Sequence, residues 1–600
     1  MGRMRNWAVV GVVIGTAAHC QAETRTLKVT DFGARGDAVQ LLVSTTSNSP
    51  VISVSGTSRF GSADVGKLVL LFGAGPYTTP TNNQDLVATI TAVSGPRSVT
   101  LSLRAGASSN DVAGVMGTQN AGAFQHCVDA SRGSKTVLSI PAGRYLLVPP
   151  EQLTTVTSSW QVPAAVVIRK GGIHFLGDGV DRSILLGCGA WKLHGNGTRA
   201  MRGFMFNLVG PVNNNAPLAF EGLTLDGGVQ AGNTGYHGFP ARLWDGAGWD
   251  ETHDAVVDSG QMPLHALKTF VNCRFTRWRG EMVKSVCGCG DGMILFSNCT
   301  FDDGNASGFN FTFTHRIDHC VFSNLFQVSE FYQAYSKDPS YMQNCLITNI
   351  TGNAIAINGA LTNSINPPYN IISNKFYKSG GFAILTTPAQ NLFIIGNDFV
   401  LTNSANGIGL GCAGYQGSAI NSNIVVALNS FTGAYSAFGI MGSGQNSTAQ
   451  ALIYSNTAVG VHWFAAGYGW STNISFWENT SDGTGLLSGQ LKGQWYLDDA
   501  SNRFPPWQVV GAAGKTNTVT YAAGMRQRTW AQFANTIFAI DDAHPQQIPP
   551  GAVLSITHAG EHPAPLYLST TMSGSSVVLR PGHKIMCQWT NGGWQELPRR

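Results

Sequence analysis

The feature that most constrains this chain is a repeat in its middle part. In each copy a polar residue, mostly Asn, lies two or three positions before an aromatic or aliphatic residue. The polar residues of successive copies lie 26, 21, 25, 30, 23 and 32 residues apart, at Asn272, Asn298, His319, Asn344, Asn374, Asn397 and Asn429. Most copies continue into a short alternating strand, such as residues 308–313. A period of this length predicts the coils of a parallel β-solenoid, with three short strands and three turns in each coil.

A stacked solenoid also explains the unusual composition. Equivalent residues of neighbouring coils lie about 4.8 Å apart, and like charges in register would repel one another. Only 12% of the residues are charged, whereas Gly occupies 72 positions. The 37 basic and 33 acidic side chains give a net charge of +4 without a long basic run, so the sequence carries no electrostatic footprint for nucleic acid.

The N-terminus reads as a targeting segment. Arg3 and Arg5 precede an uncharged run, residues 7–18, and Ala22 offers a small residue for cleavage. This pattern predicts a signal peptide over residues 1–22 and a secreted or periplasmic protein; lipidation of Cys20 is the less favoured alternative, because His19 precedes it. No later apolar run is long enough to span a membrane.

Breaks in the repeat predict the domain organisation. We expect a cap of the solenoid formed by residues 23–37 and 117–164, and a small inserted β-module over 38–116. The solenoid follows over 165–506, interrupted by a loop at 228–262. The period is lost after Pro505 and Pro506, which predicts a C-terminal β-domain over 507–600.

Two short segments carry a family resemblance. Residues 31–37 read Asp-Phe-Gly-Ala-Arg-Gly-Asp, and residues 140–145 read Ile-Pro-Ala-Gly-Arg-Tyr, with a helical pattern at 123–130 between them. Together they resemble the N-terminal signature of the pectate-lyase-like superfamily of right-handed parallel β-helix proteins. This superfamily includes polysaccharide lyases, glycoside hydrolases and tailspike-like depolymerases. The segments at 172–179 and 220–227 resemble its first coils.

The resemblance implies an all-β fold, a right-handed parallel β-helix with a small N-terminal β insertion and a C-terminal β-domain. It also implies a polysaccharide as partner and leaves open a homotrimer, as in many relatives. Gln119 and Asn120 stand where the family usually has paired Asp. The chain matches neither the calcium-binding Asp cluster of pectate lyases nor the motifs of polygalacturonases. We therefore expect neither pectin as the substrate nor a metal or other cofactor.

Charge concentrates between residues 274 and 338. Glu281 and Glu330 each follow a small residue and begin a strand, which predicts similar positions two coils apart, with Asp302 and Asp303 in the coil between. Glycoside hydrolysis uses two carboxylates, one as the proton donor and one as the base or nucleophile. These four residues are the predicted catalytic groups. The alternative is that they form surface ion pairs with Arg279, Lys284 and Arg316.

A lyase would need a cation and a base in the same groove. Arg279, Lys284, His315 and Tyr332 have suitable side chains and are the predicted substrate-binding residues, although His315 also fits a turn histidine bonded to the backbone. The loop at 228–262 adds Trp244, Trp249 and His253 as the predicted wall of the groove. The alternative is a flap that only covers the solenoid.

The cysteines share one register. Cys273, Cys299, Cys320 and Cys345 each follow a turn Asn or His, which predicts an interior stack of thiols, with disulfides as the alternative. A zinc site formed by Cys287, Cys289, Cys299 and His315 matches no standard spacing.

The sequence therefore predicts a secreted carbohydrate-active enzyme that cleaves glycosidic bonds of a polysaccharide in a β-helix groove. Hydrolysis is slightly favoured over β-elimination on a uronate polymer. A non-catalytic glycan-binding or adhesive solenoid is the alternative from another class.

Overall fold

The computed structural model describes most of the chain between residues 24 and 497 and strands beyond it. The described ranges are 24–54, 59–71, 74–75, 86–131, 135–149, 164–187, 192–193, 200–201, 204–209, 216–228, 255–258, 267–278, 280–285, 293–304, 307–311, 314–332, 338–358, 366–378, 380–387, 389–402, 404–410, 421–441, 449–482, 485–488 and 491–497, followed by nine strands between 509 and 596. The predicted signal peptide lies outside these ranges. No helix among them is long and apolar enough to cross a membrane.

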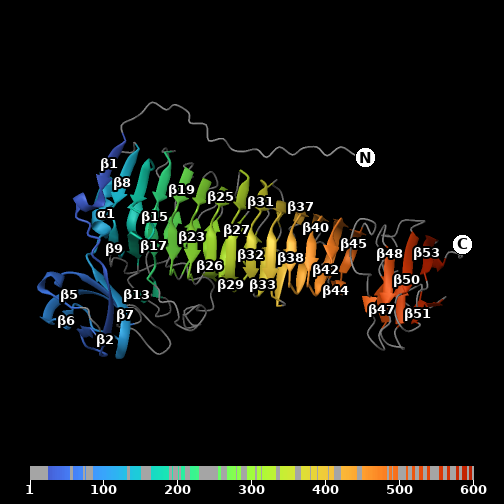
Figure 1. Ribbon diagram of the computed structural model, residues 1–600, viewed down its shortest axis with the longest axis horizontal. Helices are drawn as coiled ribbons and strands as arrows, with labels where there is room; N and C mark the ends of the chain where they lie inside the picture. The colour runs from blue at the N-terminus through green and yellow to red at the C-terminus, as the bar shows by residue number, and fades with distance from the viewer. Residues whose placement is uncertain are drawn as a thin grey trace.

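Each coil of the central solenoid contributes one strand to each of three parallel sheets (Figure 1), which we name A, B and C. Sheet A contains β1 (Arg25–Lys28), β8 (Thr136–Ile140), β11 (Ile173–Gly177), β16 (Leu218–Glu221), β19 (Leu267–Val271), β22 (Met293–Ser297), β25 (Thr314–Asp318), β28 (Ser340–Gln343), β31 (Tyr369–Ile372), β34 (Gln390–Ile395), β37 (Asn421–Ala427), β40 (Ala449–Tyr454) and β45 (Leu491–Leu497).

Sheet B follows after a short turn. It contains β9 (Gly143–Leu147), β12 (Ser183–Gly187), β17 (Thr224–Asp226), β20 (Arg274–Thr276), β23 (Thr300–Asp302), β26 (Val321–Leu325), β29 (Leu346–Ile350), β32 (Lys375–Lys378), β35 (Asp398–Leu401), β38 (Ser430–Thr432), β41 (Thr457–Val459) and β43 (Thr480–Ser481). Sheet C contains β10 (Ala164–Ile168), β15 (Phe204–Leu208), β18 (Val256–Asp258), β21 (Val283–Ser285), β24 (Ser307–Phe311), β27 (Gln327–Tyr332), β30 (Ile355–Asn358), β33 (Gly381–Thr386), β36 (Ala405–Leu410), β39 (Ser436–Met441), β42 (Trp463–Trp477) and β44 (Gly485–Ser488). The end of β42 also pairs in sheet A.

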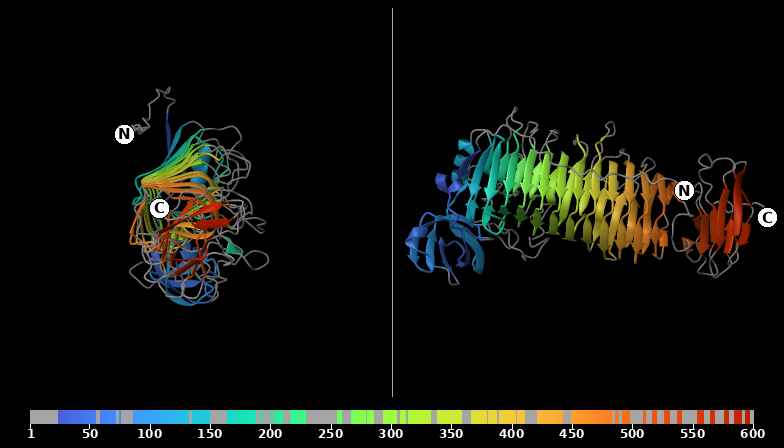
Figure 2. Two further views of the ribbon diagram at one scale, coloured as in Figure 1. Left: turned by 90° about the vertical axis from the view of Figure 1, so that its right-hand side faces the viewer. Right: turned by 45° about the horizontal axis from the view of Figure 1, so that its top comes forward.

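Smaller units stand at the two ends of the solenoid (Figure 2). An antiparallel barrel contains β2 (Val39–Thr45), β3 (Val51–Val54), β4 (Leu68–Leu71), β5 (Leu86–Gly95), β6 (Ser98–Leu101) and β7 (Ser109–Gly117). Two C-terminal sheets contain β46 (Val509–Val510), β47 (Thr516–Val519), β48 (Arg526–Trp530), β49 (Ile537–Ile540), β50 (Val553–His558), β51 (Ala564–Tyr567), β52 (Ser576–Leu579), β53 (Lys584–Thr590) and β54 (Gly593–Glu596). The predicted fold class, a right-handed parallel β-helix with these two additions, is confirmed.

The core of the solenoid is a set of stacked apolar rows. Phe270 lies between Phe220 and Phe296, with ring centroids 4.9 and 5.0 Å apart and nearly parallel planes. Such rows arise because strand side chains alternate between the two faces, so that equivalent inward residues meet one strand spacing apart. At the N-terminal end α1 (Ala121–Ala130) covers the first coil and buries Phe124 and Cys127.

The turn from sheet A to sheet B explains much of the repeat. Its first residue has a positive φ in successive coils, 50° at Asn272, 51° at Asn298 and 52° at His319. Asn and His tolerate this left-handed conformation better than most residues. The following residue points inward, and the described cysteines at this position, Cys273, Cys299, Cys320 and Cys345, are buried free thiols. Burial raises the pKa of Cys273 and Cys320, which keeps these thiols protonated.

The predicted repeat misplaces its last three asparagines by one position. Asn374, Asn397 and Asn429 do not take the place of Asn344 in the turn. They continue the row of inward cysteines, because the backbone N–H of Cys345 donates to Oδ1 of Asn374. The row then continues as an asparagine ladder through Asn456 and Asn479. The positive φ in the later coils belongs to other residues, for example Ser373 at 56°.

The asparagine ladder yields a first prediction. Asn429 donates from Nδ2 to the carbonyl of Ile394 and to Oδ1 of Asn456, both at 2.9 Å, and its own Oδ1 accepts from Asn397. Asn429→Ala removes these bonds and leaves buried partners unsatisfied, so we expect a loss of about 2–4 kcal/mol in the free energy of unfolding. Chemical denaturation measures it. Thr457→Ala, at an exposed position, is the control and is expected to change stability by less than about 0.5 kcal/mol. Equal stability of the two variants would contradict the ladder's role.

Candidate functional site

The outer side of sheet C carries a row of polar side chains. Lys284 on β21, Asn310 on β24 and Glu330 on β27 occupy one register. Their strand neighbours Val283, Phe309 and Phe331 belong to the core, so the three polar side chains leave the sheet on its outer face. We call Lys284, Asn310 and Glu330 the polar row. Since adjacent strands are about 4.8 Å apart, the backbones of Lys284 and Glu330 are separated by roughly 9.6 Å.

Glu281 extends the polar row at its N-terminal end. Its Oε2 atom lies 3.5 Å from Nζ of Lys284. Glu281 is 1% exposed, Lys284 4% and Glu330 7%, although the polar row leaves the sheet on its outer side. At the other end, Nδ2 of Asn310 donates to Oε2 of Glu330 at 3.4 Å. The site therefore combines two buried carboxylates, an ammonium group and an amide, in surroundings where electrostatic interactions are stronger than in water.

The carboxylate of Glu281 has an ion pair but no hydrogen bond among the described residues. Within the part of the chain that the structure describes, neither of its oxygens accepts a hydrogen bond. A buried carboxylate is costly to maintain unless it is paired and hydrogen-bonded, and buried polar atoms without hydrogen bonds are uncommon in folded proteins. The ion pair with Lys284 offsets part of this cost. The two oxygens of Glu281 can therefore still accept hydrogen bonds.

The two glutamates are two coils apart, as the sequence suggested, but they are not equivalent. Glu330 shares its register with Lys284, whereas Glu281 precedes β21 by two residues. Sequence reasoning also missed Asn310. Its signal was the alternation in residues 308–313, since an inward Phe309 would place Asn310 on the outer face.

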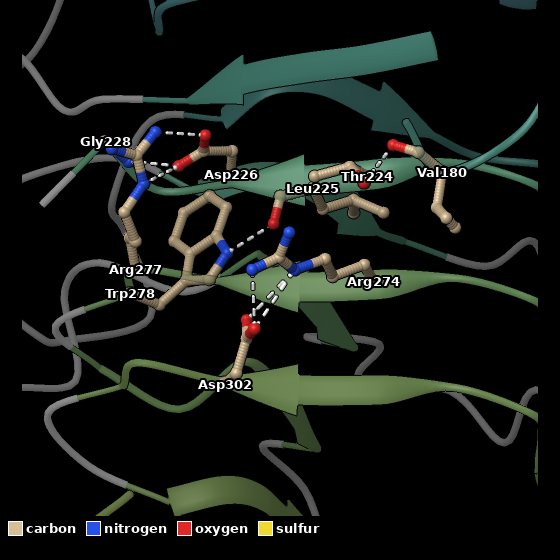
Figure 3. A network of polar contacts seen from close by, with 9 residues as sticks. All are labelled: Val180, Thr224, Leu225, Asp226, Gly228, Arg274, Arg277, Trp278 and Asp302. Atoms are coloured by element: carbon tan, nitrogen blue, oxygen red, sulfur yellow. Dashed lines mark hydrogen bonds and ion pairs between the residues drawn. The ribbon is translucent and has the colours of Figure 1, made fainter. Parts of the chain in front are cut away.

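Asp302 (Figure 3) and Asp303 lie elsewhere in the solenoid. Asp302 ends β23 in sheet B, and Nε and NH2 of Arg274 donate to it at 3.1 and 2.6 Å. Asp303 occupies the following turn and accepts from Nδ2 of Asn324 at 2.9 Å. The prediction that these two carboxylates join the glutamates is not met, because sheet B faces a different side of the solenoid. Asp302 forms an ion pair, as the alternative expected, but its partner is Arg274 and not Arg279, Lys284 or Arg316.

A second ion pair occupies the same region of sheet B. Arg277 donates from Nε to Asp226 at 2.8 Å, and Asp226 also accepts from the backbone N–H of Gly228. Between the two pairs, Nε1 of Trp278 donates to the carbonyl of Leu225 at 3.0 Å (Figure 3). These contacts bind successive coils to one another and hold Trp278 in the core.

His315 points into the solenoid. It lies on β25 two residues before core residue Ile317 and on the same face of the strand. It is 0% exposed, and its ring centroid lies 4.6 Å from that of Phe331 and 5.1 Å from that of Tyr369. The predicted contact of His315 with substrate is therefore wrong, and so is the alternative of a turn histidine. The cause is the alternation of β25, whose outward residue here is Arg316.

The remaining predicted site residues lie outside the described residues. These are Arg279, Trp244, Trp249 and His253, together with the side chain of Tyr332 and the two cysteines Cys287 and Cys289. In the described part of the chain no three His, Cys, Asp or Glu side chains are grouped to hold a metal ion. A charge pair that the sequence did not reveal is Lys268 with Asp258, in which Nζ contacts the carboxylate and both side chains are buried.

No family model matches the chain, and no curated protein matches it in sequence. Solved structures with a similar fold include the A-module of a mannuronan C-5 epimerase from Azotobacter vinelandii, at 13% identity and a TM-score of 0.38 over 65% of this chain and 96% of that one. The catalytic unit of a GH87 α-1,3-glucanase from Streptomyces thermodiastaticus is 11% identical, with a TM-score of 0.36 over 79% and 97%. The tailspike of E. coli bacteriophage HK620, solved with a pentasaccharide, is 12% identical, with a TM-score of 0.41 over 75% and 77%.

The strand order of this chain decides the fold independently of these likenesses. Parallel pairing repeats from coil to coil in all three sheets, and a helix closes the N-terminal end. As a statement of fold, the chain is a right-handed parallel β-helix, as its repeat and opening motif predict.

Proposed function

We propose that this protein is an exported enzyme that hydrolyses glycosidic bonds of a polysaccharide, with Glu281 and Glu330 as its catalytic residues. The observation that carries the proposal is a pair of buried glutamates two coils apart, each beside a polar partner: Glu330 on the outer face of sheet C and Glu281 just before β21. Hydrolysis needs one carboxyl group that donates a proton to the leaving oxygen and another that activates water or attacks the sugar.

The partners of the glutamates suggest a division of roles. Lys284 lies beside Glu281, with Nζ 3.5 Å from Oε2, and we assign Glu281 the role of the base or nucleophile. Asn310 holds Oε2 of Glu330 and orients that carboxyl group toward the substrate as the proton donor.

β-Elimination is the second candidate, supported by Lys284 in the same row. An ammonium group can neutralise the carboxylate of a uronate while a neighbouring base removes the proton beside it. The same face would serve both reactions, and the products tell them apart. The third candidate function is that of a solenoid that binds a glycan without cleaving it.

Product analysis tests the proposal. The purified protein lacking residues 1–22 is incubated with a panel of acidic and neutral polysaccharides in water enriched in ¹⁸O, and the products are examined by mass spectrometry. Hydrolysis is expected to place one ¹⁸O atom at each new reducing end, and NMR of the fresh products shows whether the anomer is inverted or retained. Products with an unsaturated uronate and no ¹⁸O would replace the hydrolase with a lyase, and unshortened polysaccharides would leave only a binding role.

A further inference from the structure

A second surface with binding chemistry lies on the outer face of sheet A. Arg316 on β25, Tyr341 on β28, Asn370 on β31 and Phe393 on β34 follow one another in a single register. We call these four residues the aromatic row. Their strand neighbours Ile317, Met342, Ile371 and Ile394 are buried in the core, so the aromatic row points away from the solenoid. Arg316 is exposed and the other three are half-buried.

The coils next to the aromatic row carry other side chains in this register. In the same register the preceding positions are Ala219, Thr269 and Leu295, and the following ones are Val425 and Leu452. None of these five side chains is aromatic or carries an amide. Two half-buried aromatic rings in an outward row are not needed to fill the core, because the inward residues of the same strands already do so. Packing of the core therefore does not explain why two aromatic rings, an amide and a cation stand in one outward row.

The spacing of the aromatic row suits a sugar chain. Tyr341 and Phe393 are two coils apart, roughly 9.6 Å, with Asn370 between them. Aromatic rings offer flat apolar surface to the C–H face of a pyranose, and amides donate to and accept from hydroxyl groups. Gln343 lies two residues after Tyr341 on the same face of β28 and adds a second amide. One aromatic ring on every second coil can therefore hold alternate residues of an extended glycan.

Arg316 adds a charge preference. Its guanidinium carbon lies 5.6 Å from the centroid of the Tyr341 ring, a cation–π arrangement that orients the side chain over the ring. A guanidinium group placed in this way keeps donors available at its edge and can bind a carboxylate through two parallel hydrogen bonds. The nearest acidic residue of the strand, Asp318, is engaged with His319 and Asn344.

We propose that the aromatic row is a binding surface for an extended glycan that carries carboxylate groups, separate from the polar row on sheet C. Tyr341 and Phe393 stack against sugar rings, Asn370 and Gln343 bind hydroxyl groups, and Arg316 binds a uronate carboxylate at one end. Such a surface would hold the polymer on the solenoid whether or not Glu281 and Glu330 catalyse its cleavage. The proposal therefore does not depend on catalysis by Glu281 and Glu330.

The test measures binding in a background that carries Glu330→Gln, so that cleavage does not interfere. Isothermal titration uses oligogalacturonate and oligomannuronate as acidic probes and cello-oligosaccharides as neutral ones. Tyr341→Ala and Phe393→Ala are each expected to weaken binding of the acidic probes about 3- to 10-fold, the range that corresponds to the loss of one aromatic contact. Arg316→Gln is expected to weaken binding of the acidic probes and leave that of the neutral ones unchanged.

Leu452→Ala is the matched control, since Leu452 is half-buried in the same register but outside the aromatic row. Its affinity is expected to equal that of the parent protein, and thermal unfolding confirms that each variant is folded. The proposal is overturned if none of the probes binds, if the aromatic variants bind like Leu452→Ala, or if they change only self-association in sedimentation. Retained binding by the Glu330→Gln parent together with absent hydrolysis by the unmodified protein would defeat the proposed function alone.

Discussion

Glu281→Gln and Glu330→Gln are each expected to lower kcat for glycan cleavage by a factor of about 10²–10⁴, the usual contribution of a positioned acid or base. Gln keeps the size of the side chain but can neither donate a proton to the leaving oxygen nor take one from water. Because both glutamates are buried next to polar partners, the amide also changes the charge that Lys284 and Asn310 face.

The control must show that the loss is chemical. Asp303→Asn is the same change of carboxylate to amide in the intervening coil, at a turn position with φ of 53° that Asn tolerates. It is expected to retain activity. Thermal unfolding of all three variants is needed, since removing one partner of a buried pair can cost about 3–5 kcal/mol. Folded Glu281→Gln and Glu330→Gln proteins with full activity would remove the proposed site.

Phe296→Ala is expected to give the largest loss of stability, about 3–5 kcal/mol in the free energy of unfolding. Phe296 is fully buried, lies 5.0 Å from the ring of Phe270, and also meets Phe275, Phe301 and Phe309. In a solenoid each coil contacts mainly its neighbours, so a cavity here weakens the interfaces on both sides. Chemical denaturation followed by circular dichroism measures the change.

Leu295→Ala provides the comparison for Phe296→Ala. Leu295 is the preceding residue of β22 but lies half-buried on the outer face, so its truncation is expected to cost less than about 1 kcal/mol. If the two variants were equally stable, the assignment of inward and outward residues on sheet A would be wrong. The aromatic row depends on the same assignment and would be withdrawn with it.

The sequence predicted only some of the residues of the candidate site correctly. The concentration of charge at 274–338 led to Glu281, Glu330 and Lys284. The structure places Lys284 and Glu330 in one register of sheet C and Glu281 beside Lys284. The same charge signal also selected Asp302 and His315, which lie on sheet B and in the core. A count of charged residues cannot separate these cases, because it ignores on which face of its strand each side chain stands. Alternation around Phe309 and Ile317 would have shown that Asn310 and Arg316 point outward and that His315 points inward.

The sequence by itself determined the coil, the inward rows and the cap. These follow from short-range rules, the two-residue alternation of a strand and the tolerance of Asn, His and Gly for a left-handed turn, and both can be read within a few residues. Only the tertiary structure decided the register between coils. Loops of very different length join the strands, so that Phe220 pairs with Phe270 whereas Phe296 pairs with Ile317. Spacing along the chain therefore does not show which residues become neighbours. Hydrogen bonds between strands fix that register, and it places Glu330 in line with Lys284 and asparagines in line with cysteines.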